Sequence, residues 1–511
     1  MFASRVRVAL YALASLSGLP GAASSQAAPD PDTRALQREL NGWFSKASRS
    51  VRGEWAIAVA NQDGRLLWGV QPSRPMIPAS TVKIFTTGFA RSVLGSDARR
   101  RTRVMGVGRV DSATGTWAGS WTLELNGDPT FERPDRGGPS LLELAGQLRA
   151  DGIRRLTGPF NVISQDGPAG ASYPDAWSRH HRGRSFAPLI GSLTLNENVL
   201  RFAIAPGARP GLPPTIVAES PLGVSALVTI KAKTVLGRSA RLRYQLTAGN
   251  HYVVLGSIGT RARSRWFTST VQDPRALLEA SWAYALRQAG IEWQQTDGLG
   301  APSPDTHTIV LAEVISQPFD SIASEVNRRS LNIGAELLLR WAGGEDRPAD
   351  RLTAHVQQIT GDYTSVHLVD GSGLSHDDRA SPLAFVSYLA RFPLSPGGRG
   401  YPMLLPANGS GTLRKLARGL PGPGVVRAKT GALGDAAALT GYLGRQDGVL
   451  LISIMYNGPR VYAARQQQWK LFRLLGAEGV IIPDDSSGVA TQLGGDVRDT
   501  LPLDPNPAPQ R

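Results

Sequence analysis

The chain of 511 residues contains no cysteine. Disulfide bonds are therefore excluded, and so is lipid attachment through a cysteine. Stability must come from a packed core instead. The hydrophobic share of 41% is ordinary for a globular protein, and the length favours two or three domains.

Lysine is also scarce. Lysine and arginine together number 56, and only seven of these are lysines, so arginine supplies most of the positive charge. Arginine cannot give up its proton in a protein, whereas a buried lysine can act as a base. A lysine at a fixed spacing from a serine therefore indicates chemistry more strongly here than in a lysine-rich chain.

Long basic blocks and long apolar segments are missing as well. A formal net charge of +15 is compatible with contact to nucleic acid, anionic lipid or an anionic wall polymer. Scattered arginines without an interleaved aromatic patch argue against nucleic acid. Beyond the N-terminal segment no run of about 18 apolar residues occurs, which predicts at most peripheral membrane contact.

The first residues have the pattern of an export signal. Arg5 and Arg7 precede an apolar stretch, Val8 to Leu19, that is too short for a stable membrane anchor. Small residues at Ser25 and Ala27 predict cleavage after residue 27, with residues 22–24 as another option. A buried N-terminal helix is the alternative. We expect residues 1–27 to be a signal peptide and the mature protein to be periplasmic or wall-associated.

Ser80-Thr81-Val82-Lys83 is the stretch with the clearest chemical pattern. Pro78 precedes an apolar run at helical spacing, so Ser80 should lie in the first turn of a helix. Positions three apart share one helix face, which lets the Lys83 amine reach the Ser80 hydroxyl. A serine paired with a lysine base is a known form of nucleophilic catalysis. The alternative is an ordinary helix start with a surface lysine.

Two later stretches complete the pattern. Ser330-Leu331-Asn332 follows a predicted helix at 319–327 and begins a second predicted helical run, Ser330–Gly343, in which Ser330 could simply be an N-cap. Lys429-Thr430-Gly431 lies between two predicted strands, where a turn with a chance lysine is the alternative. The order serine-x-x-lysine, serine-x-asparagine, lysine-threonine-glycine is typical of penicillin-binding proteins and serine β-lactamases.

Hydrophobic patterning predicts three parts after the signal. Residues 28–98 and 296–482 mix helices and strands, including a helix at 32–48, a hairpin at 54–70, strands at 365–369, 425–429, 437–443 and 449–456, and a closing helix at 461–475. Residues 99–295 are an insertion of mostly short strands, with helices at 140–150 and 274–289. Residues 483–511, rich in Asp, Gly, Pro and Ser, form a predicted disordered tail.

The chain resembles the D-alanyl-D-alanine carboxypeptidase/endopeptidase family of the penicillin-binding protein 4 type, which is peptidase family S13 (class C, low molecular mass). The resemblance rests on the three motifs and on the large insertion between the first two of them. Further shared stretches are Gly127-Asp128-Pro129-Thr130, Leu195-Asn196-Glu197-Asn198, Ala335-Glu336-Leu337-Leu338 and Asp370-Gly371-Ser372-Gly373-Leu374-Ser375.

The resemblance implies an α+β fold, with a serine β-lactamase/transpeptidase-like domain (antiparallel sheet flanked by helices) and a large mostly-β insertion. It implies Ser80 as nucleophile and Lys83 as base, with Ser330 and Asn332 bridging the proton network and the substrate amide. Lys429 and Thr430 would bind a substrate carboxylate on the Gly431 strand, and the N–H groups of Ser80 and Ala432 would form the oxyanion hole.

The implied activity is removal of the terminal D-alanine from peptidoglycan stem peptides, with D-alanyl cross-links as a further substrate, β-lactams as acylating agents, and no metal or organic cofactor. An esterase or β-lactamase on the same fold, and a non-catalytic wall-binding protein, are the alternatives.

Three departures from the family pattern stand out. Leu331 replaces the usual Asp or Asn, and Ala432 replaces Thr or Ser. Trp177 is followed by the basic run Ser178 to Arg182, where the family often has an acidic residue, so the stem side-chain preference stays open. A solvated loop is the simplest interpretation of this run.

Overall fold

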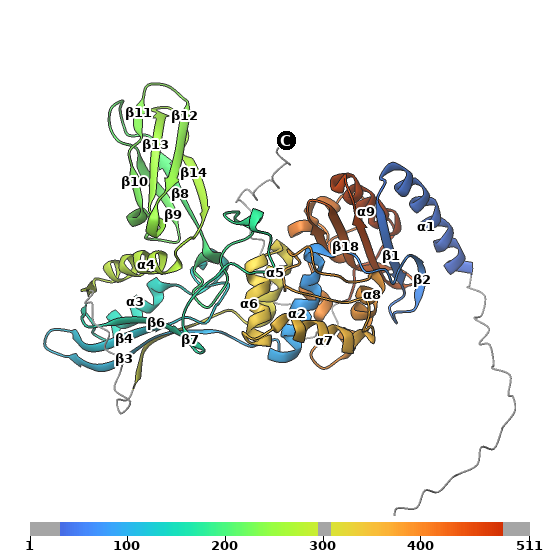
Figure 1. Cartoon of the computed structure of the whole chain (residues 1–511), viewed down its shortest axis with the longest axis horizontal. Coiled ribbons are helices and arrows are strands. Elements are labelled where there is room, and N and C mark those ends of the chain that lie inside the picture. The colour runs from blue at the N-terminus through green and yellow to red at the C-terminus, as the bar shows by residue number, and fades with distance from the viewer. Residues whose placement is uncertain (1–30, 295–307, 484–511) are drawn as a thin grey trace, which may run out of the picture.

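The computed structural model describes residues 31–294 and 308–483. The predicted signal peptide lies outside these ranges, and so does the predicted tail apart from Pro483. Figure 1 shows a helix-and-sheet part on the right, built from both ends of the chain, and a mostly β part on the left. The chain leaves the right-hand part after α2 (Val82–Leu94) and returns to it at α5 (Phe319–Arg329).

A five-stranded antiparallel sheet forms the centre of the right-hand part. Its strands are, in spatial order, β17 (Val426–Ala432), β18 (Ala436–Arg445), β19 (Gly448–Asn457), β1 (Glu54–Ala60) and β2 (Leu66–Val70). The hairpin and the three C-terminal strands predicted from the sequence are confirmed. The outer backbone groups of β17 at Val426 and Ala428 bond to the segment 406–408. Because β17 is an edge strand, the end of it beyond Ala428 is where a ligand can add.

Helices cover both faces of this sheet. Along β1, Ile57 and Val59 pack against α1 (Pro31–Ser50) and α9 (Val461–Leu475). The alternate residues, Ala56 and Ala58, face the opposite cluster, which contains side chains of α2 and α8 (Pro382–Arg391). Successive side chains of a strand point to opposite faces, so a strand covered on both sides is apolar throughout.

The helix α2 lies at the middle of its layer. Every residue from Val82 to Ala90 is buried, including the polar residues Lys83, Thr86 and Thr87, so the helix is enclosed on all sides. The helices α5, α6 (Asn332–Gly343) and α7 (Pro348–Thr360) pack around it. No helix in the described ranges is both long enough and apolar enough to cross a bilayer.

The left-hand part begins with a sheet of seven strands and two helices. They are β3 (Arg101–Asp111), β4 (Thr116–Glu124), β5 (Arg155–Leu156), β6 (Phe160–Ser164), β7 (Gly167–Pro168), β15 (Glu292–Trp293), β16 (Ile309–Ile315), α3 (Leu141–Ala150) and α4 (Pro274–Gln288). The strand β16 pairs with β3. We therefore propose that the inserted region extends to Ile315, beyond the residue 295 predicted from the sequence.

A smaller unit of strands, the β module (residues 199–270), stands above α4 in Figure 1. One sheet consists of β8 (Val199–Ala205), β9 (Thr215–Ser220) and β14 (Arg265–Thr270). The other consists of β10 (Val228–Ile230), β11 (Lys233–Val235), β12 (Ala240–Leu246) and β13 (Tyr252–Gly259). Both sheets contribute to one apolar core, which includes Phe202 and Tyr252.

The predicted strand at 365–369 is wrong. Only an isolated bridge joins His367 to Arg379. The backbone N–H of Val369 donates instead to Asp378 Oδ1 at 2.8 Å, and that of Leu368 donates to Thr353 Oγ1 at 3.1 Å. Side-chain oxygens thus accept the hydrogen bonds that the carbonyl groups of a neighbouring strand would have accepted, and the segment forms a loop.

Candidate active site

Ser80 lies in a single 3-10 turn, Ala79–Thr81, that leads into α2. This agrees with the predicted helix start. The preceding residue, Ala79, has φ of 49°, a left-handed conformation that residues with a Cβ rarely adopt. Such strain persists only where the surroundings enforce it, and it is common at functional sites. The turn leaves Ser80 half-buried at the entrance of an otherwise buried helix.

The Lys83 side chain is fully buried next to Ser80. Its Nζ lies 3.2 Å from Ser80 Oγ, 2.7 Å from Asn332 Oδ1 and 2.5 Å from the Ser372 carbonyl oxygen. Burial lowers the pKa of Lys83 to about 8, although nearby carboxyl groups oppose this shift. About a tenth of this amine would be neutral at pH 7, far more than for an ordinary lysine, and this makes it suitable as a base.

A tight loop at Asp370–Ser375 holds the Ser372 carbonyl against Lys83. The Asp370 carboxylate accepts hydrogen bonds from the backbone N–H groups of residues 372, 373, 374 and 375, at 2.5 to 3.1 Å. Gly373 has φ of 73°, and a Cβ at this position would lie 1.9 Å from the Ala79 carbonyl oxygen. In the sequence this stretch stands out only as part of the family pattern, with no role of its own. Its glycines and its buried aspartate were the available signals.

Two further buried carboxyl groups lie behind Lys83. Burial, and then the charge of Asp370, raise the pKa of Glu336 to about 8. The same two causes, in the same order, raise the pKa of Asp378 well above its usual range. Glu336 Oε1 accepts the Gly371 N–H at 2.9 Å, so it also supports the loop. A glutamate inside an apolar helical run was the only sequence signal for this group.

The second motif lies at the break between two helices, and the second helix begins at Asn332 rather than at Ser330 as predicted. The helix α5 ends at Arg329, and Ser330 adopts φ of 60° before α6 begins at Asn332. Ser330 is therefore no N-cap of α6. The turn directs Ser330 and Asn332 into the site. Asn332 Oδ1 accepts from Lys83, and Asn332 Nδ2 donates to the Phe186 carbonyl at 2.8 Å.

Leu331 is the N-cap residue of α6, with extended backbone angles and no side-chain cap. It is partly buried and packs against the core cluster that contains Val326 and Ala335. An apolar residue fits this environment, so replacement of the usual polar residue leaves the orientation of its two neighbours intact.

The third motif lies at the end of β17. Lys429 is fully buried, and its Nζ donates to Ser330 Oγ at 2.8 Å and to the Thr430 carbonyl at 2.9 Å. Burial, followed by the charges of Lys83 and Arg465, lowers the pKa of Lys429 well below its usual value. A bound carboxylate would oppose this shift and favour the protonated amine.

Gly431 allows β17 to approach the nucleophile. A Cβ at this position would lie 2.7 Å from the Pro78 carbonyl oxygen and 3.2 Å from the backbone nitrogen of Ser80. Since real Cβ atoms essentially never lie under 3.0 Å from backbone, any other residue would push the strand away from Ser80. Close packing of β17 against Ser80 thus requires glycine at this position of the third motif.

Ala432 presents its backbone N–H at the free edge of β17. The Ala428 N–H donates to the Pro406 carbonyl, and the Val426 carbonyl accepts from Asn408, so residues of this phase point away from β18. Backbone direction alternates along an antiparallel strand, and Ala432 shares the phase of Ala428. Its side chain is exposed, so the missing hydroxyl leaves the backbone donor unaffected.

The three motifs, far apart in sequence, therefore meet. Hydrogen bonds join Ser80, Lys83 and Asn332 in one group and Ser330 and Lys429 in another. Thr430, Gly431 and Ala432 form the strand edge beside them. A segment of the insertion closes one side, because Trp177 donates to Asp370 and the Phe186 carbonyl accepts from Asn332.

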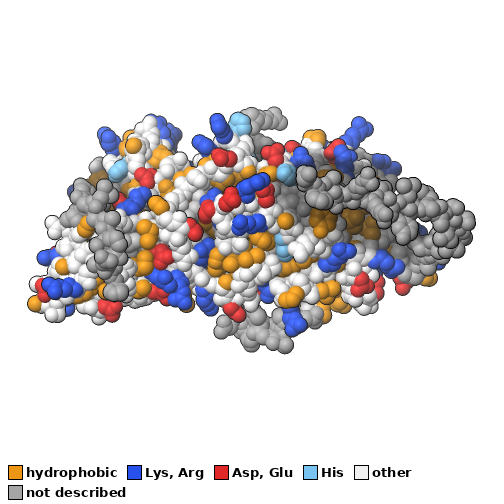
Figure 2. Space-filling view, turned by 60° about the horizontal axis from the view of Figure 1, so that its bottom comes forward, with side chains coloured by type: hydrophobic (Ala, Val, Ile, Leu, Met, Phe, Trp, Pro, Cys, Tyr) orange, Lys and Arg blue, Asp and Glu red, His pale blue; other side chains and the backbone are white. Residues whose placement is uncertain are grey.

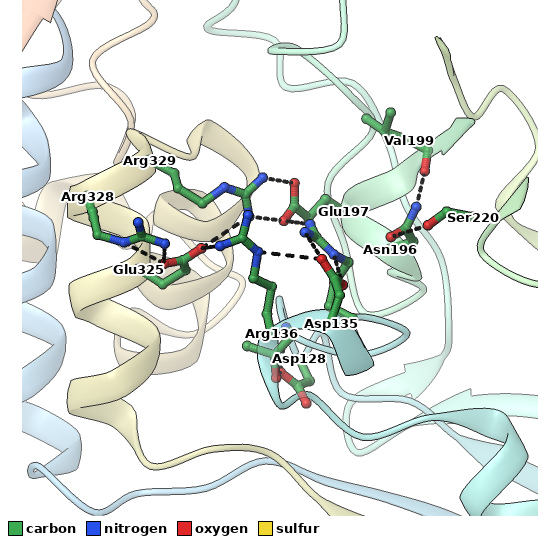
Figure 3. Close-up of polar contacts among 12 residues, drawn as sticks. Asp128, Asp135, Arg136, Asn196, Glu197, Val199, Ser220, Glu325, Arg328 and Arg329 are labelled. Atoms are coloured by element: carbon green, nitrogen blue, oxygen red, sulfur yellow. Dashed lines mark hydrogen bonds and ion pairs between the residues drawn. The ribbon is translucent and has the colours of Figure 1, made fainter. Parts of the chain in front are cut away.

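A network of ion pairs fixes the inserted region to α5, immediately before Ser330 (Figure 3). Glu197 forms a bidentate pair with Arg329, at 2.5 and 3.0 Å, and also pairs with Arg133. Arg329 in turn lies 3.5 Å from Glu325. Glu197 is the middle of three successive residues with positive φ, so a strained turn in the insertion faces the strained turn at Ser330.

Removal of the Glu197 carboxylate should destabilise this junction. In Glu197→Ala, Arg133 would keep, among the described residues, only its pair with Asp135 and Arg329 only its longer contact with Glu325. Because the site is partly buried, we expect a loss of about 1–3 kcal/mol. The matched control is Glu279→Ala, which removes a more exposed i,i+4 ion pair with Arg275 on α4 and should cost about 0.5 kcal/mol or less. Urea unfolding of both variants measures the difference. Equal small losses would contradict a structural role for the network.

Comparisons with known proteins agree with this geometry. The chain is 27% identical over 426 residues to the D-alanyl-D-alanine carboxypeptidase of Actinomadura sp. (strain R39), covering 79% of this chain and 77% of that protein. It is 24% identical over 438 residues to the penicillin-sensitive carboxypeptidase A of Dictyostelium discoideum, covering 79% and 82%.

Among solved structures, penicillin binding protein 4 from Haemophilus influenzae superposes with a TM-score of 0.66 at 19% identity, covering 84% of this chain and 98% of that one. The same protein in complex with a β-lactam gives a TM-score of 0.62. These structures confirm the expected α+β fold.

The sequence profile of one family matches residues 41–475, which is most of the chain and includes all three motifs. This match confirms the resemblance drawn from the motifs. The chain belongs to the D-Ala-D-Ala carboxypeptidase 3 (S13) family.

Proposed function

We propose that this chain is a serine-type D-alanyl-D-alanine carboxypeptidase that acts on peptidoglycan stem peptides through an acyl-enzyme on Ser80. The observation that carries the proposal is the buried Lys83 amine, 3.2 Å from Ser80 Oγ and with a pKa of about 8. Family membership supports the substrate class. D-alanyl cross-links are proposed as a second substrate.

In the acylation step, neutral Lys83 accepts the Ser80 proton while Oγ attacks the carbonyl of the penultimate D-alanine. The N–H groups of Ser80 and Ala432 stabilise the negative oxygen of the tetrahedral intermediate. The C–N bond then breaks, and the amine of the terminal D-alanine leaves with the proton that Lys83 accepted from Ser80, relayed by the Ser330 hydroxyl. Water attacks the resulting ester with Lys83 again as base, which releases the shortened peptide and restores the Ser80 hydroxyl.

Substrate binding is assigned to β17. An extended peptide can add to the free edge of this strand by backbone hydrogen bonds. Its terminal carboxylate would lie near the Thr430 hydroxyl and the Lys429 amine, which becomes fully charged on contact with the anion. Gly431 keeps this edge close to Ser80.

The rate of acylation should depend on pH through Lys83. Below pH 8 the amine is mostly protonated, so kcat/KM should rise up to tenfold per pH unit and level off above about 8. The second-order rate constant for acylation by a penicillin between pH 6 and 9 measures this. A flat profile, or a rate that falls as pH rises over this range, would contradict Lys83 as the base.

Product analysis separates the proposed function from its alternatives. Mass spectrometry should show loss of one D-alanine from a pentapeptide, and cleavage of a cross-linked muropeptide if the second substrate is also used. A stable penicillin adduct is expected. Rapid penicillin hydrolysis without peptide cleavage would favour a β-lactamase or esterase, and no reaction with either compound would favour a wall-binding protein.

We also propose export to the periplasm or cell wall, with cleavage after Ala27. The N-terminal pattern of basic, apolar and small residues supports this. N-terminal sequencing of the exported chain should give Ala28 as the first residue. Recovery of the uncleaved chain from the cytoplasm would contradict it.

A further inference from the structure

The β module carries most of the excess positive charge of the protein. Residues 199–270 contain ten lysines and arginines but one acidic residue, Glu219, which gives +9 of the total +15. Near the middle of the molecule, by contrast, Figure 2 shows basic side chains interleaved with acidic ones. Glu219 itself accepts the backbone N–H groups of Gly223 and Ser225. The imbalance is therefore a local property of this module.

Strand pairing gathers some of these charges on one face. Lys233 of β11 and Arg241 of β12 both pair with Ser257 of β13, so all three side chains point to the same side of the sheet. Arg243 follows two residues later on the same face. Lys233, Arg241 and Arg243 are exposed, whereas the alternate residues Thr234 and Leu242 are buried. The outer face of the sheet is basic.

Other charges gather at the tip of the module, which we define as the loops 206–213, 236–239 and 260–264. Backbone hydrogen bonds join these loops to one another and to β11, such as Arg261 N to the Gly237 carbonyl and Gly211 N to the Thr234 carbonyl. The opposite end of the strands contacts α4, where Asn250 donates to the Asp273 carbonyl. The tip therefore projects away from α4.

The composition of the tip is unusual for a free surface. It carries four exposed arginines, at positions 209, 238, 261 and 263, and none of them forms an ion pair within the described residues. Leu236 is 81% exposed among them, and Leu212 is 39% exposed. Protruding leucines beside unpaired basic side chains are typical of surfaces that enter the headgroup region of a membrane.

We propose that this tip binds the surface of a membrane that contains anionic phospholipids. The arginines contact lipid phosphates, and Leu236 inserts among the acyl chains just below the headgroups. A soluble anionic polymer would also attract the arginines but would leave an 81%-exposed leucine without a partner. The proposal is independent of the peptidase activity, and it gives the enzyme a peripheral attachment near the site where new wall is made.

Vesicle sedimentation tests the proposal, with all chains beginning at Ala28 so that the apolar N-terminal segment does not contribute. Vesicles of phosphatidylglycerol and phosphatidylcholine should bind the protein, and vesicles of phosphatidylcholine alone should not. The variant Arg238→Ser/Arg261→Ser/Arg263→Ser should bind at least about 50-fold more weakly, since each basic residue near an anionic surface contributes about fivefold. Leu236→Ser should weaken binding about five- to tenfold.

The matched control is Arg414→Ser/Arg418→Ser/Lys470→Ser, which removes the same charge from exposed positions of the catalytic part. It should change vesicle binding less than about threefold, and all variants should keep penicillin labelling. If the control lost as much vesicle binding as the tip variant, net charge alone would explain the binding, and the proposal would be overturned. Unchanged vesicle binding by Leu236→Ser, together with tight binding of inorganic polyphosphate, would overturn it in favour of a soluble polyanion. Absence of vesicle binding would also overturn it.

Discussion

Ser80→Ala is expected to abolish penicillin labelling and to lower peptide cleavage by a factor of about 10⁴ or more. The substitution removes the only atom that can form the acyl-enzyme, and loss of a serine nucleophile in other serine hydrolases has effects of this size or larger. The measurements are labelling by a tagged penicillin and turnover of a pentapeptide by mass spectrometry.

The fold should survive this change. In the structure, the Ser80 hydroxyl is half-buried and bonds to Lys83, which keeps its bonds to Asn332 and Ser372 in the variant. We therefore expect the free energy of unfolding to change by less than about 1 kcal/mol. Labelling that persists in a folded Ser80→Ala protein would eliminate Ser80 as the nucleophile.

Lys83→Arg should be almost as damaging, with a loss of about 10³- to 10⁴-fold in the acylation rate. Arginine keeps the positive charge but cannot release its proton at any accessible pH. The site is fully buried, so the larger guanidinium could also disturb the structure. Lys83→Met, which has a similar length and no charge, tests the same role with a different structural disturbance.

The pH profile distinguishes a lost base from a disturbed fold. In folded Lys83→Met, the residual acylation should no longer level off near pH 8, because the group that titrates there is gone. Circular dichroism and thermal melting provide the control for folding. A Lys83→Arg protein with full activity would overturn the role assigned to this amine.

The candidate active-site residues could be selected from the sequence because each motif is local and chemically distinctive. Ser80 and Lys83 are three residues apart, and Lys429 is one of seven lysines in the chain. The spacing of the motifs along the chain does not by itself predict that these segments meet in space. It followed from a family resemblance, and the hydrogen bonds among Lys83, Asn332, Ser330 and Lys429 give it a physical basis.

The break between the two helices was predicted from the sequence, but its position was two residues off, since the stretch Asn327 to Asn332 contains no glycine or proline to mark where a helix ends. Long-range contacts hold the boundary at Ser330: Arg329 pairs with Glu197, 132 residues away, and Ser330 bonds to Lys429, 99 residues away. Local propensity is weak enough for such contacts to override it.

The loop at residues 365–375 was missed for a similar reason. Ser365 to Val369 has the residue types of a strand, but its hydrogen bonds go to Asp378 and Thr353. The two-residue strands β5, β7 and β15 are too short for any periodicity to indicate them. The basic face of the β module was hidden because Lys233 and Arg241 become neighbours only through their common pairing with Ser257.

The most direct test of the central claim is to locate the penicillin adduct on the protein. After incubation with a penicillin and proteolysis, mass spectrometry should find the whole penicillin mass on the peptide that contains Ser80, at one adduct per chain. An adduct on a different residue, or none on a folded chain at pH 8, would contradict the proposed acyl-enzyme.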